Sequence, residues 1–436
     1  MEDRKESHSP RAIAACIALG CLIGGIVGAV IFFFKLIGEH LEEISHHIYE
    51  AASSDPLMTV LVILGLTILA VAMYLLHRFA PEIKGGGIPR STGIMRGVLS
   101  FRRIRTLVGT VIGSWISFFS GLLLGSEGPS VLIGTSIGSL FQPVTKKDIW
   151  SRYMPTAGAG AGFAVATGSP LTAVLFIIEE VHKRLTARLV LITSASVLAA
   201  YSVNRLLCGA FGISHLLFPI DRLPEISFSQ IGYVLLLGVI VAAFVWIFDV
   251  LVVGFRTLMK KAGKRIPDLV KLLFVFVVTG VVGIIRPSAI YGGRGLLLGI
   301  LDGSSVFGLV AILLCWRLIM MILTSNSGAT GGSFVPTLCI GGLIGGVSAE
   351  LMISIGMPAE LYGVFVLIAM CAFLGGTMRA PLTAIVFFVE ATCQSENLFF
   401  AVLAVFVVYF ITNALGRHSF NDVVLEEMIG AQGKLA

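Results

Sequence analysis

The sequence predicts an all-α polytopic membrane protein that contains two inverted-topology repeats with broken and tilted helices. Three observations predict this fold class: a strongly apolar composition, apolar stretches interrupted by glycine and proline, and segments that recur about 210 residues later in the chain. Hydrophobic residues make up 56% of the 436 residues, and charged residues make up only 13%. Because a soluble domain carries about 25% charged residues, this composition indicates a chain that lies in lipid.

Several apolar stretches are long enough to cross a bilayer as a helix, which takes about 20 residues. The clearest are residues 12–34, 58–76 and 231–253. The first is too long for the apolar part of a signal peptide and has no small-residue cleavage site after it, so we expect a retained helix. Other stretches are shorter and are broken by glycine or proline, which predicts half-helices that are shielded by protein.

Two pairs of segments divide the chain into halves. Residues 125–134 (GSEGPSVLIG) recur in altered form at residues 332–341 (GSFVPTLCIG), and residues 170–180 are echoed by residues 381–391. Because both pairs come in the same order at nearly the same offset, they indicate a duplicated half rather than a short repeat. Transporters often contain two such halves in inverted orientation, with the substrate site between their broken helices.

We therefore predict a single transmembrane domain over residues 1–436, with no large soluble domain after it. The expected parts are a first half over about 12–207, a linker over about 208–227, a second half over about 228–413 and an amphipathic C-terminal segment over 417–436. The last segment mixes apolar and charged residues and is too polar to cross the bilayer.

Lysine and arginine residues are gathered in a few loops and at the N-terminus. By the positive-inside rule these regions should be cytoplasmic, which predicts a multi-pass protein of the cell (inner) membrane with a cytoplasmic N-terminus. The net charge of +6 then reflects topology, and no basic stretch with interleaved aromatics predicts a nucleic-acid partner. The clusters are Arg4, Lys5 and Arg11; Arg96, Arg102, Arg103 and Arg105; Lys183, Arg184 and Arg188; and Lys260, Lys261, Lys264 and Arg265.

The cysteine and histidine residues predict no metal site, cofactor or disulfide framework. The seven cysteines include no C-x-x-C pair, and the histidines, His418 among them, have no H-E-x-x-H or other ligand spacing. An intramembrane enzyme would need a nucleophile–base or metal constellation, and no suitable spacing is visible. We therefore expect a protein that is not an enzyme and that works without a cofactor.

Three glycine breaks followed by proline predict helix N-termini inside the membrane. They lie at residues 85–89 (GGGIP), 125–129 (GSEGP) and 332–336 (GSFVP). A helix N-terminus presents unpaired backbone N–H groups and the positive end of the helix dipole, so it is suited to bind an anion. A phosphate-binding loop is excluded because no GK[ST] follows.

In this order the three segments resemble the signatures GSGIP, GxEGP and GxFxP of the CLC family of chloride channels and chloride/proton exchangers. The resemblance covers essentially the whole chain and is to the prokaryotic type without C-terminal CBS domains. It implies the CLC fold, a homodimer in membrane lipid, and one anion pathway in each subunit. Chloride or a related monovalent anion would be the bound substrate ion, and protons would be the second substrate.

Glu127 is the sharpest candidate for chemistry. An acidic residue in an apolar span is costly and usually functional. A helix N-terminus favours its charged form, whereas burial favours its neutral form, so the group can compete with an anion when ionised and leave when protonated. By resemblance, Glu127 is the external gating and proton-carrying glutamate.

Two further glutamates follow in the first half, and one lies at the matching place in the second half. By resemblance, Glu180 is the internal proton-transfer glutamate, which favours coupled exchange over a passive channel of the same fold. We interpret Glu179 as a carboxylate at a wet helix end that is matched by nearby cations. We interpret Glu390 as a structural acid that pairs locally.

Two positions depart from the family pattern. The serine of GSGIP, which contacts the central anion, is Gly86 here, and Phe420 falls where the family has a tyrosine that supplies a second hydroxyl. Ser419 could supply a hydroxyl if the alignment slips by one residue. If both departures hold, the anion loses two hydrogen bonds of about 1 kcal/mol each. It would then depend on backbone N–H groups, and those expected are Ser333 and Phe334 on the inner side and Ser126, Glu127 and Gly128 on the outer side.

A fluoride-exporting relative is a third possibility within this fold. That branch typically has Met or Asn at the position of Gly86 and lacks the internal glutamate, so Glu180 argues against it.

Overall fold

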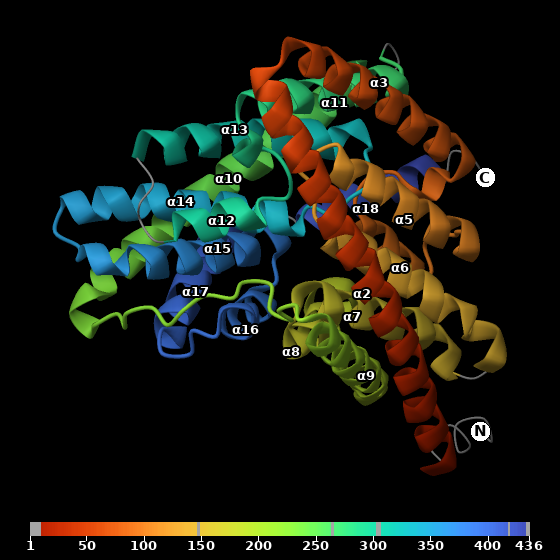
Figure 1. Ribbon diagram of the computed structural model, residues 1–436. Coiled ribbons are helices and arrows are strands. Elements are labelled where there is room, and N and C mark those ends of the chain that lie inside the picture. The colour runs from red at the N-terminus through yellow and green to blue at the C-terminus, as the bar shows by residue number, and fades with distance from the viewer. Residues whose placement is uncertain (1–9, 146–148, 263–265, 302–306, 417–418, 433–436) are drawn as a thin grey trace.

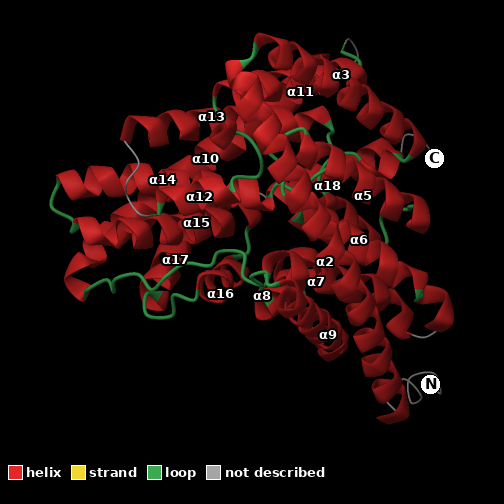
Figure 2. Cartoon of the chain, in the orientation of Figure 1, coloured by secondary structure: helices red, strands yellow, loops and turns green. Residues whose placement is uncertain are grey.

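The computed structural model describes residues 10–145, 149–262, 266–301, 307–416 and 419–432, and this part of the chain consists of helices and loops (Figures 1 and 2). Within these described ranges, eight helices are long and apolar enough to cross a membrane. The predicted all-α polytopic fold class is therefore confirmed. Several predicted features lie outside the described residues: Arg4, Lys5, Lys264, Arg265, His418 and the ends of the C-terminal segment.

The two halves use the same order of elements. In each half two long helices are followed by a 3₁₀ turn, a short helix, and then five further helices. The first half contains α2 (Pro10–Ser54), α3 (Pro56–Phe79), η1 (Pro81–Ile83), α4 (Gly87–Met95), α5 (Arg103–Phe119), α6 (Glu127–Leu140), α7 (Met154–Thr167), α8 (Pro170–Phe176), the π-helical turn η4 (Ile177–His182) and α9 (Ala187–Phe211). Two 3₁₀ turns, η2 (Gln142–Thr145) and η3 (Ile149–Tyr153), precede α7.

The second half repeats this order after the loop that follows α9. It contains η5 (Phe228–Gln230), α10 (Ile231–Ala262), α11 (Asp268–Ile285), η6 (Pro287–Ala289), α12 (Arg294–Ile300), α13 (Phe307–Ser327), α14 (Phe334–Ser354), η7 (Ala359–Leu361), α15 (Tyr362–Met378), α16 (Pro381–Thr392) and α17 (Leu398–Ala414). A last helix, α18 (Phe420–Gln432), follows it and packs against α4.

Local sequence explains where several helices begin. Asp55 accepts a hydrogen bond from the backbone N–H of Leu57 and caps α3, whose first residue is a proline. Helices α8 and α16 also begin with proline. Helix α2 continues 20 residues beyond the predicted apolar span, because no glycine–proline break interrupts residues 35–54 and most of them favour helix.

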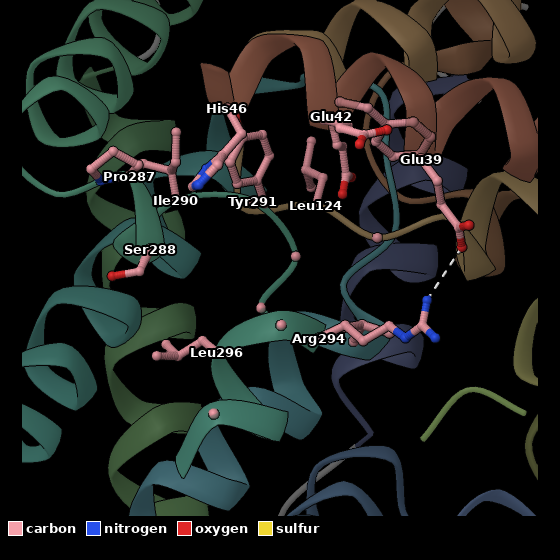
Figure 3. Close-up of a pocket in the computed structure, with 18 of the residues that line it drawn as sticks. Glu39, Glu42, His46, Leu124, Pro287, Ser288, Ile290, Tyr291, Arg294 and Leu296 are labelled. Atoms are coloured by element: carbon pink, nitrogen blue, oxygen red, sulfur yellow. Dashed lines mark hydrogen bonds and ion pairs between the residues drawn. The ribbon is translucent and has the colours of Figure 1, made fainter. Parts of the chain in front are cut away.

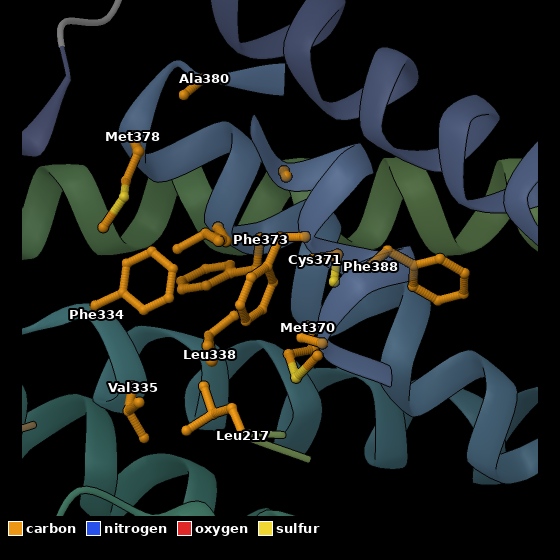
Figure 4. Packing of buried hydrophobic residues seen from close by; sticks show 14 of the residues in the cluster. Leu217, Phe334, Val335, Leu338, Met370, Cys371, Phe373, Met378, Ala380 and Phe388 are labelled. Carbon is orange, nitrogen blue, oxygen red and sulfur yellow. The ribbon is translucent and has the colours of Figure 1, made fainter. Parts of the chain in front are cut away.

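The centre of each half is a helix that is buried on all sides. Every residue of α7 and of α15 is buried, and these helices pack against α6 and α14, respectively. Around the start of α14, Phe334 and Leu338 lie among Met370, Phe373 and Phe388 (Figure 4). The two central pairs therefore form equivalent cores on either side of the junction between the halves.

The halves are tied together by two carboxylates that cap each other's helices. Glu179, at the end of the first-half pair α8 and η4, accepts hydrogen bonds from the backbone N–H groups of Leu382 and Thr383 at the start of α16. Glu390, at the end of α16, does the same for Leu171 and Thr172 at the start of α8. Each carboxylate also accepts a bond from the threonine hydroxyl, at 2.7 Å.

This arrangement corrects two interpretations from the sequence. Glu179 does not pair with the nearby cations, and Glu390 does not pair locally; each binds the opposite half of the chain. The physical reason is that a buried helix N-terminus needs acceptors for its unpaired N–H groups. Antiparallel packing of α8 on α16 brings the final carboxylate of each helix to the start of the other.

Candidate functional site

Three helix N-termini meet at the junction between the halves. Gly125 and Gly332, which precede α6 and α14, exchange two backbone hydrogen bonds of 2.7 and 2.8 Å. The start of α4 lies against them: a Cβ atom at Gly87 would lie 2.0 Å from the carbonyl oxygen of Gly128, and one at Gly128 would lie 2.8 Å from the Cα of Gly332. Only glycine allows this approach, so the motif glycines are explained by contact.

The residues expected to bind the anion lie at these helix starts. Ser126 and Ser333 are the N-caps of α6 and α14, and neither side chain caps its own helix. Neither N-cap serine therefore occupies the backbone N–H groups of its helix, in contrast to Asp55 at the start of α3. Phe334 is fully buried, and its ring packs edge-on against Phe163 and Phe387 with centroid distances of 5.2 and 5.5 Å.

Glu127 is the first residue of α6 and is only 2% exposed. Its carboxylate turns back over Gly125, where a Cβ atom would lie 2.4 Å from Oε2. Ser126 Oγ donates to Oε1 at 3.3 Å, and the backbone N–H groups of Glu127 and of Val335 in α14 stabilise the negative charge. The carboxylate thus lies between the starts of two helices, one from each half.

A cavity of about 730 Å³ is lined in part by Gly125, Ser126 and Glu127. The polar second part of α2 supplies Glu39 and Glu42 to its lining (Figure 3). Figure 3 also shows Arg294 from α12, whose Nη1 pairs with Glu39 at 3.3 Å. The cavity connects the candidate gate to charged side chains that the sequence analysis did not consider. We call it the vestibule.

Two cations near this site, the half-buried Lys35 and the buried Arg317, were also missed. Lys35 lines the vestibule, donates from Nζ to the carbonyl oxygen of Ala166 at 2.9 Å and lies close enough to Glu127 to stabilise its charge. Arg317, in α13, is 1% exposed and donates to three backbone carbonyls of the vestibule wall. Both residues interrupt apolar sequence, and a charge inside an apolar span was a signal that could have identified them.

Glu180 lies at the other candidate proton site, in the π-helical turn η4, and is 2% exposed. Its Oε1 accepts hydrogen bonds from Ser419 Oγ and from Asn421 Nδ2, both at 2.9 Å. A π-helical turn is rare and is often found at functional sites. From this turn Glu179 reaches the start of α16 and Glu180 reaches the start of α18.

Gly86 and Phe420, which provide no hydroxyl group, lie at the starts of α4 and α18. Gly86 is the N-cap of α4, and a Cβ atom there would have no neighbour closer than Pro89 Cδ at 3.6 Å. The Phe420 ring lies against Phe248, with centroids 6.1 Å apart, and under the Arg256 guanidinium. The Ser419 hydroxyl, which could have replaced the missing one, is directed to Glu180.

Aromatic rings connect the region of Glu127 to that of Glu180. Phe334 packs on Phe163, which stacks on Phe176 with a centroid distance of 4.3 Å. Phe176 is four residues before Glu180 on the same helical segment. A close-packed aromatic cluster therefore extends from the start of α14 to the helical segment that carries Glu180.

Comparisons with known proteins agree with this architecture. The family described as "Voltage gated chloride channel" matches residues 64–413. The H(+)/Cl(-) exchange transporter ClcA of Vibrio campbellii is 28% identical over 430 residues, which is 95% of this chain and 86% of that protein. The name of this relative describes a transporter rather than an enzyme.

Solved structures show the same fold. A slow cyanobacterial Cl⁻/H⁺ antiporter has a TM-score of 0.85 at 24% identity and covers 96% of this chain and 99% of its own. A CLC-type fluoride/proton antiporter has a TM-score of 0.78 at 19% identity and covers 93% of this chain and 96% of its own. With the family match extending over most of the sequence, this multi-pass membrane protein belongs to the voltage-gated chloride channel family and has the CLC fold.

Proposed function

We propose that the protein exchanges chloride for protons across the membrane, with Glu127 as the outer gate and proton carrier and Glu180 as the inner proton group. One observation carries this proposal. The buried Glu127 carboxylate lies where the starts of α6 and α14 meet and lines a cavity of about 730 Å³. Two helix N-termini suit a chloride ion as well as they suit a carboxylate. Relatives that are named as H(+)/Cl(-) exchange transporters support the same conclusion.

The exchange follows from competition for these helix starts. Ionised Glu127 holds the N–H groups and excludes the anion. Protonation removes its charge and therefore its attraction to the helix dipoles, so the side chain moves toward the vestibule. The anion then binds the freed backbone N–H groups, which we expect to be Ser126, Glu127 and Gly128 on the outer side and Ser333 and Phe334 on the inner side.

The setting of this exchange is also a proposal. We expect a homodimer in the cell (inner) membrane, with the N-terminus in the cytoplasm and a separate anion pathway in each subunit. Gly86 and Phe420 provide no hydroxyl for the central anion, so we expect weak binding and poor discrimination among halides and nitrate.

Flux from reconstituted liposomes tests the function. A chloride gradient should drive proton movement in the opposite direction, and Glu127→Gln should abolish the proton movement while anion flux continues. Glu180→Gln should also remove proton movement, because the inner relay is lost. Chloride flux without proton movement in the wild type would make the protein a channel. Proton movement that is driven by fluoride but not by chloride would make it a fluoride antiporter.

A further inference from the structure

Among the described residues, the Glu180 carboxylate is held by neutral donors and not by a cation. Ser419 Oγ and Asn421 Nδ2 both donate to Oε1, and both come from the segment at the start of α18. The second oxygen, Oε2, is buried and has no hydrogen-bond partner among the described residues. The two oxygens of this carboxylate therefore have different surroundings.

The charged side chains nearby are engaged elsewhere. Asp422 pairs with Lys183 and with Arg96. Arg96 also donates to the backbone carbonyls of Glu180 and Val181, and so holds the backbone of η4 rather than the carboxylate. His182 is in contact with the Thr156 hydroxyl at 3.0 Å, and Glu179 caps α16.

This distinction matters for proton transfer. A buried carboxylate that is paired with a cation stays ionised, because losing its charge leaves the cation unpaired. Two neutral donors favour the ionised form less strongly, and they keep an acceptor when the acid is neutral, because Oε1 can remain a carbonyl oxygen. Such a group can take up and release a proton without losing its position.

We infer that Ser419 and Asn421 are positioning residues for proton transfer, which hold Oε1 of Glu180 and leave Oε2 as the atom that takes up and releases the proton. Uptake forms an O–H bond at Oε2 and gives the neutral acid; release breaks that bond and restores the carboxylate. Two further polar atoms, Asn421 Oδ1 and the Thr92 hydroxyl of α4, are also buried and have no partner in the described part of the chain. Helix α4 packs against both η4 and α18.

The start of α18 departs from the family pattern at Phe420, and its neighbours Ser419 and Asn421 have a role at Glu180. The segment Ser419–Phe420–Asn421 carries no tyrosine hydroxyl, and its central ring is turned to Phe248 and Arg256. Its two polar side chains are turned to Glu180 instead. The start of α18 is thus built around the inner proton group in this chain.

The inference rests on the proposed function, in which Glu180 carries the proton. The test measures proton and chloride fluxes together in liposomes for Ser419→Ala, Asn421→Leu and the double variant. The proton-to-chloride ratio of the double variant should fall about tenfold, because a group held about 1 Å out of place can lose up to about a hundredfold in rate. Each single variant should fall in the same direction by less, and Ser419→Thr, which keeps the hydroxyl, should keep the ratio.

Two reference variants separate the possible results. Glu427→Gln weakens the anchoring of α18 to Arg256 without touching Glu180, and should keep the wild-type ratio. If it lowers the ratio as much as the double variant does, or if the double variant keeps the wild-type ratio, the positioning role is wrong. If the double variant does not fold, single variants with the wild-type ratio overturn the role in the same way. If Glu180→Gln itself keeps proton movement, the proposed function fails instead.

Discussion

The two halves of the chain share their framework but not their chemistry. Helices α6 and α14 both begin at the junction after a glycine break, yet α6 begins with Glu127 and α14 with Phe334. Helices α8 and α16 both end in a capping carboxylate, yet the residue after it is Glu180 in the first half and Ala391 in the second. The repeated features build the fold. The acidic residues Glu127 and Glu180 have no acidic counterpart in the second half.

The difference teaches how an inverted repeat can become a coupled transporter. Symmetry supplies two helix starts that face each other, which is sufficient for an anion. A proton also needs groups that can change charge, and only the first half supplies them at the matching positions. At these positions the second half has Phe334 and Ala391, and the Phe334 ring packs against Phe163 and Phe387.

The largest loss of stability is expected for a substitution at the junction between the halves, where the two halves also differ. Gly87 is the first residue of α4, and Gly292 lies two residues before α12, the helix that takes the place of α4 in the second half. A Cβ atom at Gly87 would lie 2.0 Å from a backbone oxygen, whereas one at Gly292 would lie 3.2 Å from the nearest atom. Gly87→Ala should therefore destabilise the protein by about 3 kcal/mol, and Gly292→Ala by less than about 1 kcal/mol. Thermal unfolding in detergent measures both, and equal losses would contradict the asymmetry.

Substitution of the two capping carboxylates tests whether the caps stabilise the two halves equally. Glu179→Gln and Glu390→Gln each remove one ionised acceptor from two N–H groups and a hydroxyl, so each should cost about 2 kcal/mol of stability. The same thermal measurement should give nearly equal shifts for the two variants. A much larger loss for one of them would mean that the two caps are equal in geometry but not in energy.

Much of the fold could be predicted from the sequence, because apolar spans and glycine–proline breaks are local signals. The same is true of Glu127, Gly86 and the three helix starts, which are carried by contiguous motifs. The cap partners of Glu179 and Glu390 could not be predicted, since each lies more than 200 residues away and depends on how α8 packs on α16. The hydrogen bond from Ser419 to Glu180 could not be predicted either, because it depends on where α18 packs after the second half.

The smallest expected effect is on chloride affinity and concerns Gly86. Gly86 lies at the start of α4 with an ordinary φ of −72° and open space around it, so a side chain can be added there without strain. Gly86→Ser offers a hydroxyl beside the joined helix starts and should strengthen chloride binding by about 1 kcal/mol, which is about fivefold in affinity. Gly86→Ala adds the same Cβ without the hydroxyl and should leave the affinity unchanged. Calorimetric titration of the two variants isolates the hydroxyl. Equal affinities of Gly86→Ser and Gly86→Ala would mean that the backbone N–H groups at the helix starts already satisfy the anion without a hydroxyl group.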